Sequence, residues 1–338
     1  MAPDRFSSAL ESLRGEDSSR FGGKSASLGA LLEAGIRVPP GFALSADAYR
    51  GFVEAAGLRD RLADPALDPE SIRAAIRAAP IPDGVRDEIE SHYRSLSEPP
   101  VAVRSSALGE DSEEATFAGQ QETYLWVRGV DAVCDAVRDC WASLYTPGAV
   151  SYRARLRSAD DVPMGVTVQT MVDAEVSGVM FTCNPVSGDP SVVAINASWG
   201  LGLAVVGGEV TPDEYVLSKV TGEIVRATVN DKSVEYVPHP DGHGATRADV
   251  PRERARARCL DDGALQSLLE MGKRVERHFG SRQDIEWALA RGEQAPDNLY
   301  VLQSRPVTAI AQPSLKAAPK SAISAVMATF GANVSRRG

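Results

Sequence analysis

Apolar residues recur with helical spacing through much of the first hundred positions. Leu28, Leu31 and Leu32 share one face of a helix predicted from Ser25 to Ala34, and Gly35 is placed to end it. The prolines that follow, in Val38-Pro39-Pro40-Gly41-Phe42, exclude helix and predict extended or turned chain. Three more helices are predicted: after Ser45 as N-cap, after Asp68 with Pro69 in the first turn, and from Val85 to Leu96.

The pattern changes at Val101. Val101-Ala102-Val103 is typical of a short buried strand, and the β-branched, turn-punctuated stretch 165–237 predicts a run of strands. The remaining predicted elements are a strand at 123–127, helices at 130–144 and 260–279, and a closing strand pair at 284–289 and 299–307. Helices that come first and strands that follow predict an α+β fold with two lobes around a cleft.

Composition narrows the possible functions. The 338 residues carry 43% hydrophobic and 24% charged residues and a net charge of −10, which fits a globular protein and disfavours nucleic acid or anionic membranes as partners. No apolar run reaches the about 18 residues of a transmembrane helix, and the N-terminus lacks the apolar centre of a signal peptide. Four scattered cysteines, Cys134, Cys140, Cys183 and Cys259, predict reduced, buried thiols and a cytoplasmic location.

The closing strand pair carries the most informative polar pattern. Asp284 and Glu286 are two positions apart, so they face the same side of their strand, and Gln303 and Arg305 repeat that spacing on the next one. If the strands pair, two acids, an amide and a guanidinium converge on one face. That set can hold Mg²⁺ through oxygens and neutralise phosphate through arginine, although the solvated face of an amphipathic hairpin shows the same pattern.

Arg104 follows the buried strand directly, in Val-Ala-Val-Arg-Ser-Ser. The planar fork of its guanidinium suits a pair of phosphate oxygens. The alternative is a salt bridge to one of the acids just downstream, which are Glu110, Asp111, Glu113 and Glu114.

Two glycine-containing turns are further candidates. Phe21-Gly22-Gly23-Lys24-Ser25 is not a P-loop, because Ser18 stands where the motif requires glycine, but it presents Lys24 at a helix start that favours phosphate. Taken alone, the local sequence favours an ordinary surface lysine at position 24. The stretch 116–121, with Gly119 and Gln120, either closes over a triphosphate through its backbone N–H groups or is a plain hairpin turn.

Together these segments resemble one protein family closely. FGGKSASLGALLEAGIRVPPGFALSADAY, VAVRSSALGEDSEEATFAGQQETYLWV, VTVQTMVDAEVSGVMFTCNPVSG, NASWGLG with GGEVTPDEYVL, DIEWAL and YVLQSRPVT occur in order over residues 21–308. They resemble the ATP-grasp nucleotide domain of the phosphoenolpyruvate synthase, pyruvate phosphate dikinase and rifampin phosphotransferase family. The resemblance implies a two-lobed ATP-grasp-like fold with one lobe at 1–190, a second at 191–311, and a linker-like tail at 312–338.

The resemblance also implies roles for individual residues. Lys24, Arg104 and Arg305 would act on the ATP phosphates, with Arg305 stabilising charge during transfer. Gly119 and Gln120 would belong to a loop over the triphosphate, and Gln169, Met171 and Val172 would hold adenine at the hinge. Glu286 and Gln303 would hold Mg²⁺, with Asp284 beside them.

The reaction that the resemblance implies needs a partner. A histidine on a separate domain attacks the β-phosphate of ATP, AMP leaves, and a phosphoryl group finally passes to an acceptor bound by a substrate domain. None of the four histidines, His92, His239, His243 and His278, lies in the family's Thr- or Ser-His context. We therefore expect either one part of a longer enzyme or a subunit that works with a histidine-bearing partner.

One position departs from the family pattern. Leu203 stands in Gly200-Leu201-Gly202-Leu203, where relatives usually carry glutamate, so docking of the histidine domain or turnover could be altered. A second hypothesis is accordingly a nucleotide-sensing protein that keeps the ATP site without phosphotransfer. The intact set Lys24, Arg104, Glu286, Gln303 and Arg305 disfavours it. An unrelated ATP-grasp carboxylate ligase is a weaker third possibility.

Overall fold

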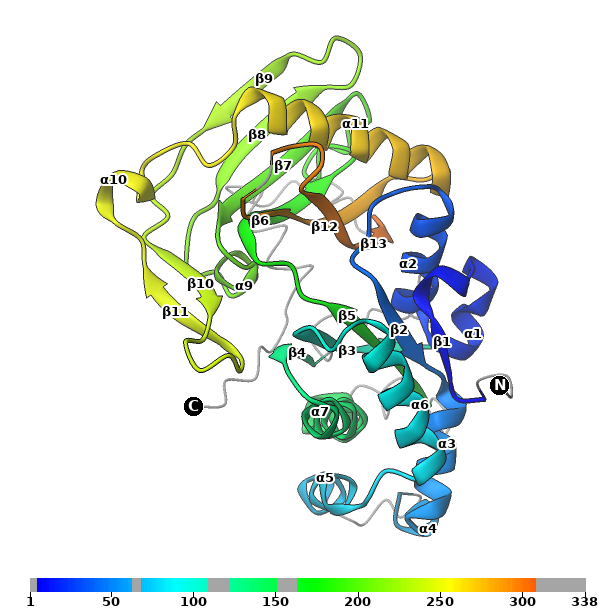
Figure 1. Cartoon of the computed structure of the whole chain (residues 1–338). Helices are drawn as coiled ribbons and strands as arrows, with labels where there is room; N and C mark the ends of the chain where they lie inside the picture. The colour runs from blue at the N-terminus through cyan, green and yellow to red at the C-terminus, as the bar shows by residue number, and fades with distance from the viewer. Residues whose placement is uncertain (1–4, 63–67, 109–121, 151–162, 293, 308–338) are drawn as a thin grey trace.

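Two antiparallel sheets, each with helices packed against it, organise the protein (Figure 1). The structure is a computed structural model that describes residues 5–62, 68–108, 122–150, 163–292 and 294–307. It has the α+β class and the two lobes that the sequence predicts. Among the described residues, no helix combines the length and the apolar character that crossing a membrane requires.

The first sheet has the strand order β1-β2-β5-β3-β4, and all its neighbouring strands run antiparallel. Its strands are β1 (Ser7–Ala9), β2 (Gly41–Leu44), β3 (Val101–Ala107), β4 (Thr123–Val127) and β5 (Met164–Thr170). Val101, Val103, Val166 and Val168 point into an apolar core beneath this sheet. The core's opposite side is formed by helices, including α7 through Trp141.

The helices of this lobe follow their local signals. Asp68 caps α5 by accepting a hydrogen bond from the N–H of Ser71 at 3.1 Å, and Pro69 occupies the first helical position. The elements are η1 (Leu10–Ser12), η2 (Gly15–Asp17), α1 (Ser18–Phe21), α2 (Gly23–Glu33), α3 (Ala46–Ala55), α4 (Arg59–Leu62), α5 (Pro69–Ala78), α6 (Asp83–Ser95) and α7 (Val130–Ser143).

The second sheet has the order β13-β12-β6-β7-β8-β9. Its strands are β6 (Ala174–Phe181), β7 (Val192–Trp199), β8 (Asp213–Ser218), β9 (Ile224–Thr228), β12 (Gln283–Ala290) and β13 (Leu299–Pro306). The long helix α11 (Asp262–Phe279) covers one face, with Leu265, Leu268 and Val275 buried against Ile285 and Trp287. The opposite face looks toward the first lobe.

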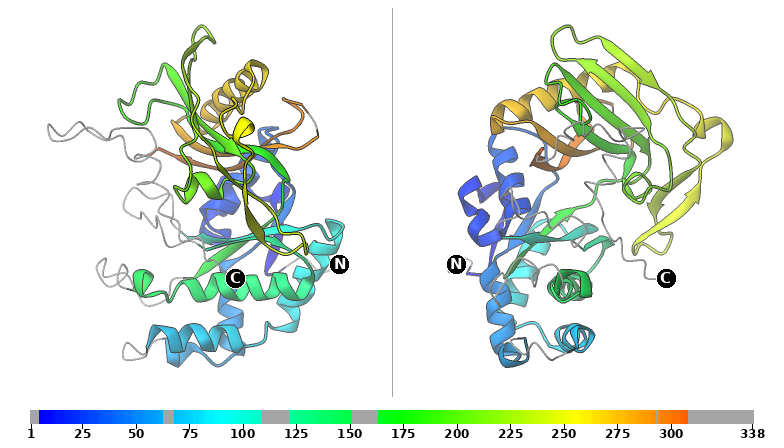
Figure 2. Two further views of the ribbon diagram at one scale, coloured as in Figure 1. Left: turned by 90° about the vertical axis from the view of Figure 1, so that its left-hand side faces the viewer. Right: turned by 180° about the vertical axis from the view of Figure 1, so that it is seen from behind.

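Three smaller elements complete the second lobe. They are α9 (Leu203–Val206), α10 (Arg252–Ala255) and a two-stranded hairpin of β10 (Val234–Pro238) and β11 (Ala245–Asp249) that joins neither main sheet. Figure 2 shows this hairpin reaching from the second lobe toward the first. All four cysteines are buried and free, as predicted.

The lobes meet earlier in the chain than residue 190. β5 belongs to the first sheet and β6 to the second, so the sheet boundary falls at residues 171–173. The core does not divide at this point, because Leu28 and Leu31 of α2 are buried in the same cluster as Met180 and Trp287. β6 belongs to the second sheet because it pairs with the next strand, β7, on one side and with the distant strand β12 on the other. The tail predicted for 312–338 lies outside the described residues.

Candidate functional site

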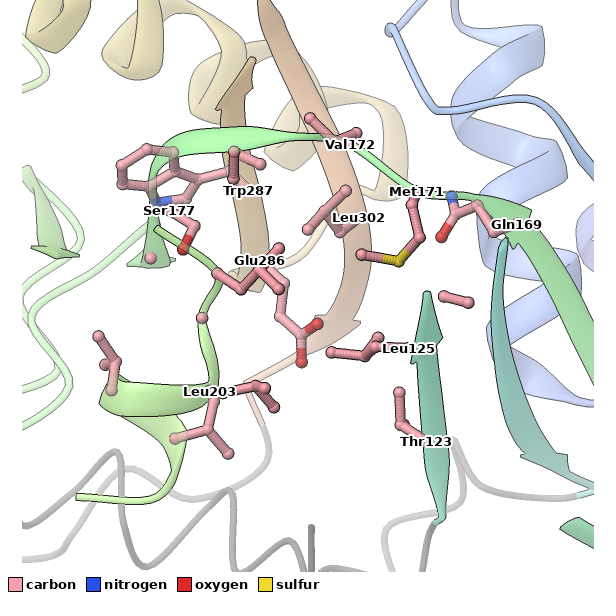
Figure 3. Close-up of a pocket in the computed structure, with 18 of the residues that line it drawn as sticks. Thr123, Leu125, Gln169, Met171, Val172, Ser177, Leu203, Glu286, Trp287 and Leu302 are labelled. Carbon is pink, nitrogen blue, oxygen red and sulfur yellow. The ribbon is translucent and has the colours of Figure 1, made fainter. Parts of the chain in front are cut away.

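A cavity opens between the two lobes. The empty space within it and at its solvent-open mouth is about 1050 Å³. One wall comes from the first sheet, through Ala102, Arg104, Thr123 and Leu125. The roof is the chain between the sheets, and the other walls are the cleft face of the second sheet and the segment around α9. Figure 3 shows the carboxylate of Glu286 directed into the space between Leu203 and Leu125.

The closing strand pair has the arrangement predicted from its alternation. β12 and β13 are antiparallel neighbours, with Asp284 opposite Arg305 and Glu286 opposite Gln303. Nε of Arg305 lies 3.0 Å from Oδ2 of Asp284. Two acids, an amide and a guanidinium therefore share one face of the sheet, and the face is that of the cleft.

Arg104 reaches across the cleft to the same strand pair. Its Nη2 lies 2.8 Å from Oε2 of Glu286, and its Nη1 donates to the carbonyl of Leu302 at 3.1 Å. Both side chains of the ion pair are mostly buried, with exposed fractions of 14% and 19%. The acids proposed as local partners, at positions 110–114, lie outside the described residues, so the partner that the structure shows is Glu286.

Burial sets the protonation of Asp284. The residue is 3% exposed, and one carboxylate oxygen, Oδ1, has no hydrogen-bond partner among the described residues. Removal from water raises the pKa of Asp284 to about 6; Arg305 opposes this rise, and the nearby charge of Glu286 adds to it. The site therefore contains a carboxyl group that has a pKa of about 6 and one oxygen without a hydrogen-bond partner among the described residues.

Lys24 lies in the second position of α2 and is 9% exposed. The turn before it packs tightly on β3: Gly22 has a φ of 82°, and a Cβ there would lie 2.3 Å from the carbonyl oxygen of Ser106. Oγ of Ser25 lies 2.7 Å from Oγ1 of Thr167 on β5. The helix start is thus fixed to the first sheet, although Lys24 is not among the described residues that line the cavity.

The predicted hinge residues line the cavity roof. Gln169 is the penultimate residue of β5 and its side chain is buried, and Met171 and Val172 lie in the link from β5 to β6. Two carbonyls fix this link, since Pro40 accepts from the N–H of Thr170 at 2.8 Å and Pro100 from that of Met171 at 2.9 Å. Gly119 and Gln120 lie outside the described residues.

The structure brings Arg104, Gln169, Met171, Val172 and Glu286 together around one cavity. Asp284, Gln303 and Arg305 adjoin Glu286 on the strand pair without lining that cavity. The sequence analysis missed the apolar lining, which includes Ala102, Leu125, Leu201 and Leu302. One signal was available, because Ala102 is two positions before Arg104 on β3 and so faces the same way.

The oxygen donors suit a cation that arrives with its own ligands. Glu286 and Gln303 are paired in register, and Oδ1 of Asp284 is open beside them. Among the described residues, no group of three or more acidic, histidine or cysteine side chains forms a complete cage for a metal. Mg²⁺ typically takes one or two carboxylates and completes its shell with substrate phosphates and water, which this donor set allows.

Comparison with known proteins gives a consistent picture. The family model "Pyruvate phosphate dikinase, AMP/ATP-binding domain" matches residues 18–324. The chain is 39% identical over 336 residues to a probable phosphoenolpyruvate synthase of Methanothermobacter thermautotrophicus, covering 94% of this chain and 48% of the relative. It is 38% identical over 362 residues to the phosphoenolpyruvate synthase of Pyrococcus furiosus, covering 90% and 44%. The chain thus spans less than half the length of these relatives.

Among solved structures, D-alanyl-alanine synthetase A from Vibrio cholerae is similar over 89% of this chain and 58% of its own. The identity is 10% and the TM-score is 0.32.

Proposed function

The chain belongs to the family of pyruvate phosphate dikinase AMP/ATP-binding domains, and on that premise we propose that it binds ATP with Mg²⁺ in the cleft between its lobes. It would act as the nucleotide module of a dikinase-type phosphotransferase. The observation that carries this proposal is the ion pair between Arg104 and Glu286, in which a guanidinium suited to phosphate and a carboxylate suited to Mg²⁺ come from opposite lobes.

Binding would replace that ion pair. Triphosphate oxygens would take the guanidinium of Arg104, with Lys24 at the start of α2 as a second cation. The apolar walls and the roof at Gln169, Met171 and Val172 would receive adenine. Gly119 and Gln120 would belong to the loop over the triphosphate. Family membership supports these proposed roles, and Arg104, Gln169, Met171 and Val172 line the cavity.

Glu286 and Gln303 would hold Mg²⁺, and Asp284 would support them with its open oxygen. The ion would supply charge neutralisation to the triphosphate. With Glu286 engaged as a metal ligand, the guanidinium of Arg104 would be available to the triphosphate. Arg305, held by Asp284 at 3.0 Å, would then face the phosphoryl groups as a fixed donor aimed at charge that develops during transfer.

The transfer itself would proceed by attack of a histidine nitrogen on the β-phosphorus. A nitrogen–phosphorus bond forms, the bond from that phosphorus to the oxygen bridging the α- and β-phosphates breaks, and AMP leaves with this oxygen. The β- and γ-phosphoryl groups stay on histidine until water or a second acceptor takes the γ-phosphate. The protein contributes positioning and charge stabilisation, as in phosphoryl transfer generally.

We propose that the nucleophile comes from another domain or subunit. His239 and His243 are exposed at the tip of the β10–β11 hairpin, His278 is exposed near the end of α11, and His92 is stacked on Phe42. None of them is among the described residues lining the cavity. The names of the relatives suggest pyruvate as the final acceptor, which a further substrate-binding domain would bind.

One observation favours a second candidate function, a nucleotide sensor without phosphotransfer. Leu203 lines the cavity across from Leu125, so an apolar side chain occupies the position where the family usually has a carboxylate (Figure 3). A sensor would bind MgATP and release no AMP when offered a phosphorylatable histidine domain.

Thermal unfolding tests the binding proposal. A ligand that binds only the folded state stabilises it by about 2.7 kcal/mol at one hundred times its Kd, so millimolar MgATP should raise the melting temperature by several degrees. Glu286→Gln should lose most of this rise. The matched control Glu270→Gln, which changes an exposed glutamate paired with Lys273, should keep it. No rise for the unaltered protein would count against the binding site.

A further inference from the structure

The β10–β11 hairpin has a firmly anchored root. Asp213 is fully buried beside this root, and its carboxylate accepts from Nζ of Lys232 at 2.5 Å and from the N–H groups of Asn230 at 2.9 Å and Cys259 at 3.1 Å. Tyr215 donates its hydroxyl to the same carboxylate at 3.1 Å. A buried ion pair with this many hydrogen bonds resists rearrangement, because opening it leaves an uncompensated charge.

The tip of the hairpin touches the other lobe by two hydrogen bonds. Nε of Arg128 donates to the carbonyl of Gly242 at 3.1 Å, and the N–H of Gly244 donates to the carbonyl of Trp126 at 3.2 Å. Trp126 lies in an irregularity of β4 opposite β3 and has a φ of 56°, which is unusual for an aromatic residue. The tip contact thus has fewer hydrogen bonds than the root, and the one donated by Arg128 is exposed to solvent.

Between root and tip, the hairpin holds a wall of the cavity. The carbonyl of Tyr236 accepts from the N–H of Leu201 at 2.9 Å, and its hydroxyl donates to Glu209 at 2.7 Å. Arg247 pairs with the other oxygen of Glu209 at 3.5 Å. Both ends of the segment 201–209, which includes α9 and lines the cavity, are thus fastened to the hairpin.

The opposite wall is fastened to the hairpin as well. Thr123 and Leu125 line the cavity on β4, and Trp126 follows them directly. The side chains of Trp126 and Leu201 belong to one apolar cluster with the partly buried Tyr236. Figure 1 shows the hairpin extending from the second lobe toward β4, so it links the two walls outside the cavity itself.

We propose that the β10–β11 hairpin is a strap across the cleft whose tip must leave Trp126 and Arg128 before nucleotide can enter or leave. The root stays fixed by Asp213 and Lys232, whereas the contact with β4 consists of two hydrogen bonds and the packing of Tyr236 and Ala245 near Trp126, which open together when the tip releases. The inference rests on the proposed function of the cavity as a nucleotide site. The strap controls the rates at which nucleotide associates and dissociates. The equilibrium affinity stays nearly unchanged, since no group of the tip lines the cavity.

Stopped-flow fluorescence with a methylanthraniloyl derivative of ATP and Mg²⁺ tests the proposal. Arg128→Ala removes one tip hydrogen bond and should raise both the association and the dissociation rate roughly threefold to tenfold, with Kd unchanged within about twofold. Arg256→Ala, whose exposed ion pair with Asp231 lies near the root, serves as the control and should leave both rates unchanged. Unchanged rates in Arg128→Ala, or a change in Kd alone, would overturn the strap.

A second variant guards against a folding artefact. Tyr236→Phe removes the hydroxyl that fastens Glu209 and keeps the ring in its cluster. This variant should also accelerate nucleotide exchange. In the double variant the exchange rate should rise by less than the product of the two single-variant increases, because both substitutions act on one strap. Fully multiplicative effects would contradict a single connected element.

Hydrogen exchange separates failure of the strap from failure of the nucleotide site. In the protein without nucleotide, Arg128→Ala should increase exchange of amides in 201–209 as well as at the hairpin tip. If the probe does not bind the unaltered protein at millimolar concentration, the proposed function is wrong and the strap loses its role in nucleotide exchange. If the probe binds and exchange in 201–209 is unchanged, the strap alone is wrong.

Discussion

Nη2 of Arg104 lies 2.8 Å from Oε2 of Glu286, and this ion pair joins β3 of the first sheet to β12 of the second. The two residues belong to different lobes and have different proposed ligands, phosphate for the arginine and Mg²⁺ for the glutamate. Each neutralises the other in a largely buried setting. MgATP can separate them without leaving either charge unpaired, because it offers an anion to one and a cation to the other.

The two partners should respond differently to Mg²⁺. Arg104→Ala should weaken ATP binding with and without Mg²⁺ alike, by about tenfold or more, since a hydrogen bond to a charged group contributes about 1.5–3 kcal/mol. Glu286→Gln should weaken binding only when Mg²⁺ is present. Titration calorimetry with MgATP and with ATP plus a chelator measures both, and Arg94→Ala, on an exposed helix surface, is the control. The same Mg²⁺ dependence in Glu286→Gln and the unaltered protein would refute the metal role.

Asp284 should make stability depend on pH in a defined direction. Its pKa is about 6 in the folded protein, against an ordinary value of 3.8 for an aspartate in the unfolded chain, so between these values the folded state binds more protons than the unfolded state. Its contribution to the free energy of unfolding is therefore full below about pH 4 and is lost as the pH rises through 6, by roughly 2–3 kcal/mol at most. Urea unfolding without nucleotide should show this loss in the unaltered protein.

The matched comparison uses Asp284→Asn, which cannot ionise and should flatten this part of the pH profile. Asp131→Asn, which changes an exposed carboxylate, should retain it. A profile for Asp284→Asn that parallels the unaltered protein between pH 4 and 6 would show that Asp284 does not titrate in this range.

Arg305→Ala should harm phosphotransfer more than nucleotide binding. Loss of a donor aimed at developing charge typically lowers kcat by about 10²–10³, or about 2.7–4 kcal/mol. The assay needs a histidine-bearing partner domain, with AMP release as the readout. The kcat of Arg305→Lys should lie between those of the unaltered protein and Arg305→Ala, because lysine keeps the positive charge but lacks the planar guanidinium. Equal losses in affinity and turnover would identify Arg305 as a ground-state anchor.

Arg305 also neutralises Asp284, so its removal has a second effect to control. The double variant Asp284→Asn with Arg305→Ala removes the buried charge together with its partner. If the single variant fails only because Asp284 is left unpaired, the double variant should recover most of the activity. A catalytic role for Arg305 requires that it does not.

Much of the fold follows from local sequence signals. Asp68 with Pro69 predicts the start of α5, and the strand at 123–127 is found at its predicted bounds. The helix predicted at 260–279 begins slightly later, at Asp262, because Asp261 caps it by accepting from the N–H of Ala264 at 2.7 Å. The position of the lobe boundary could not be predicted as well from the sequence. It depends on the pairing of β6 with the distant strand β12, and no local pattern encodes that pairing.

The site shows the same division between local and distant information. Strand alternation alone placed Asp284, Glu286, Gln303 and Arg305 on one face, and the register of β12 and β13 agrees. The partner of Arg104 was not predictable, because Glu286 is 182 positions away and nearer acids were plausible. The strap was also missed, because its contact with Trp126 and Arg128 exists only in the folded chain.

We propose that the cleft delivers the β-phosphate of MgATP to a histidine on another domain. The most direct test of this proposal incubates the protein with ATP labelled at the β- or the γ-phosphate, with and without a separately purified histidine-bearing phosphocarrier domain. We expect negligible AMP from the protein alone. With the partner domain, we expect AMP together with acid-labile phosphohistidine that carries the β-label. AMP formation by the isolated protein that is abolished by replacing His92, His239, His243 or His278, or β-label that never reaches the partner's histidine, would contradict it.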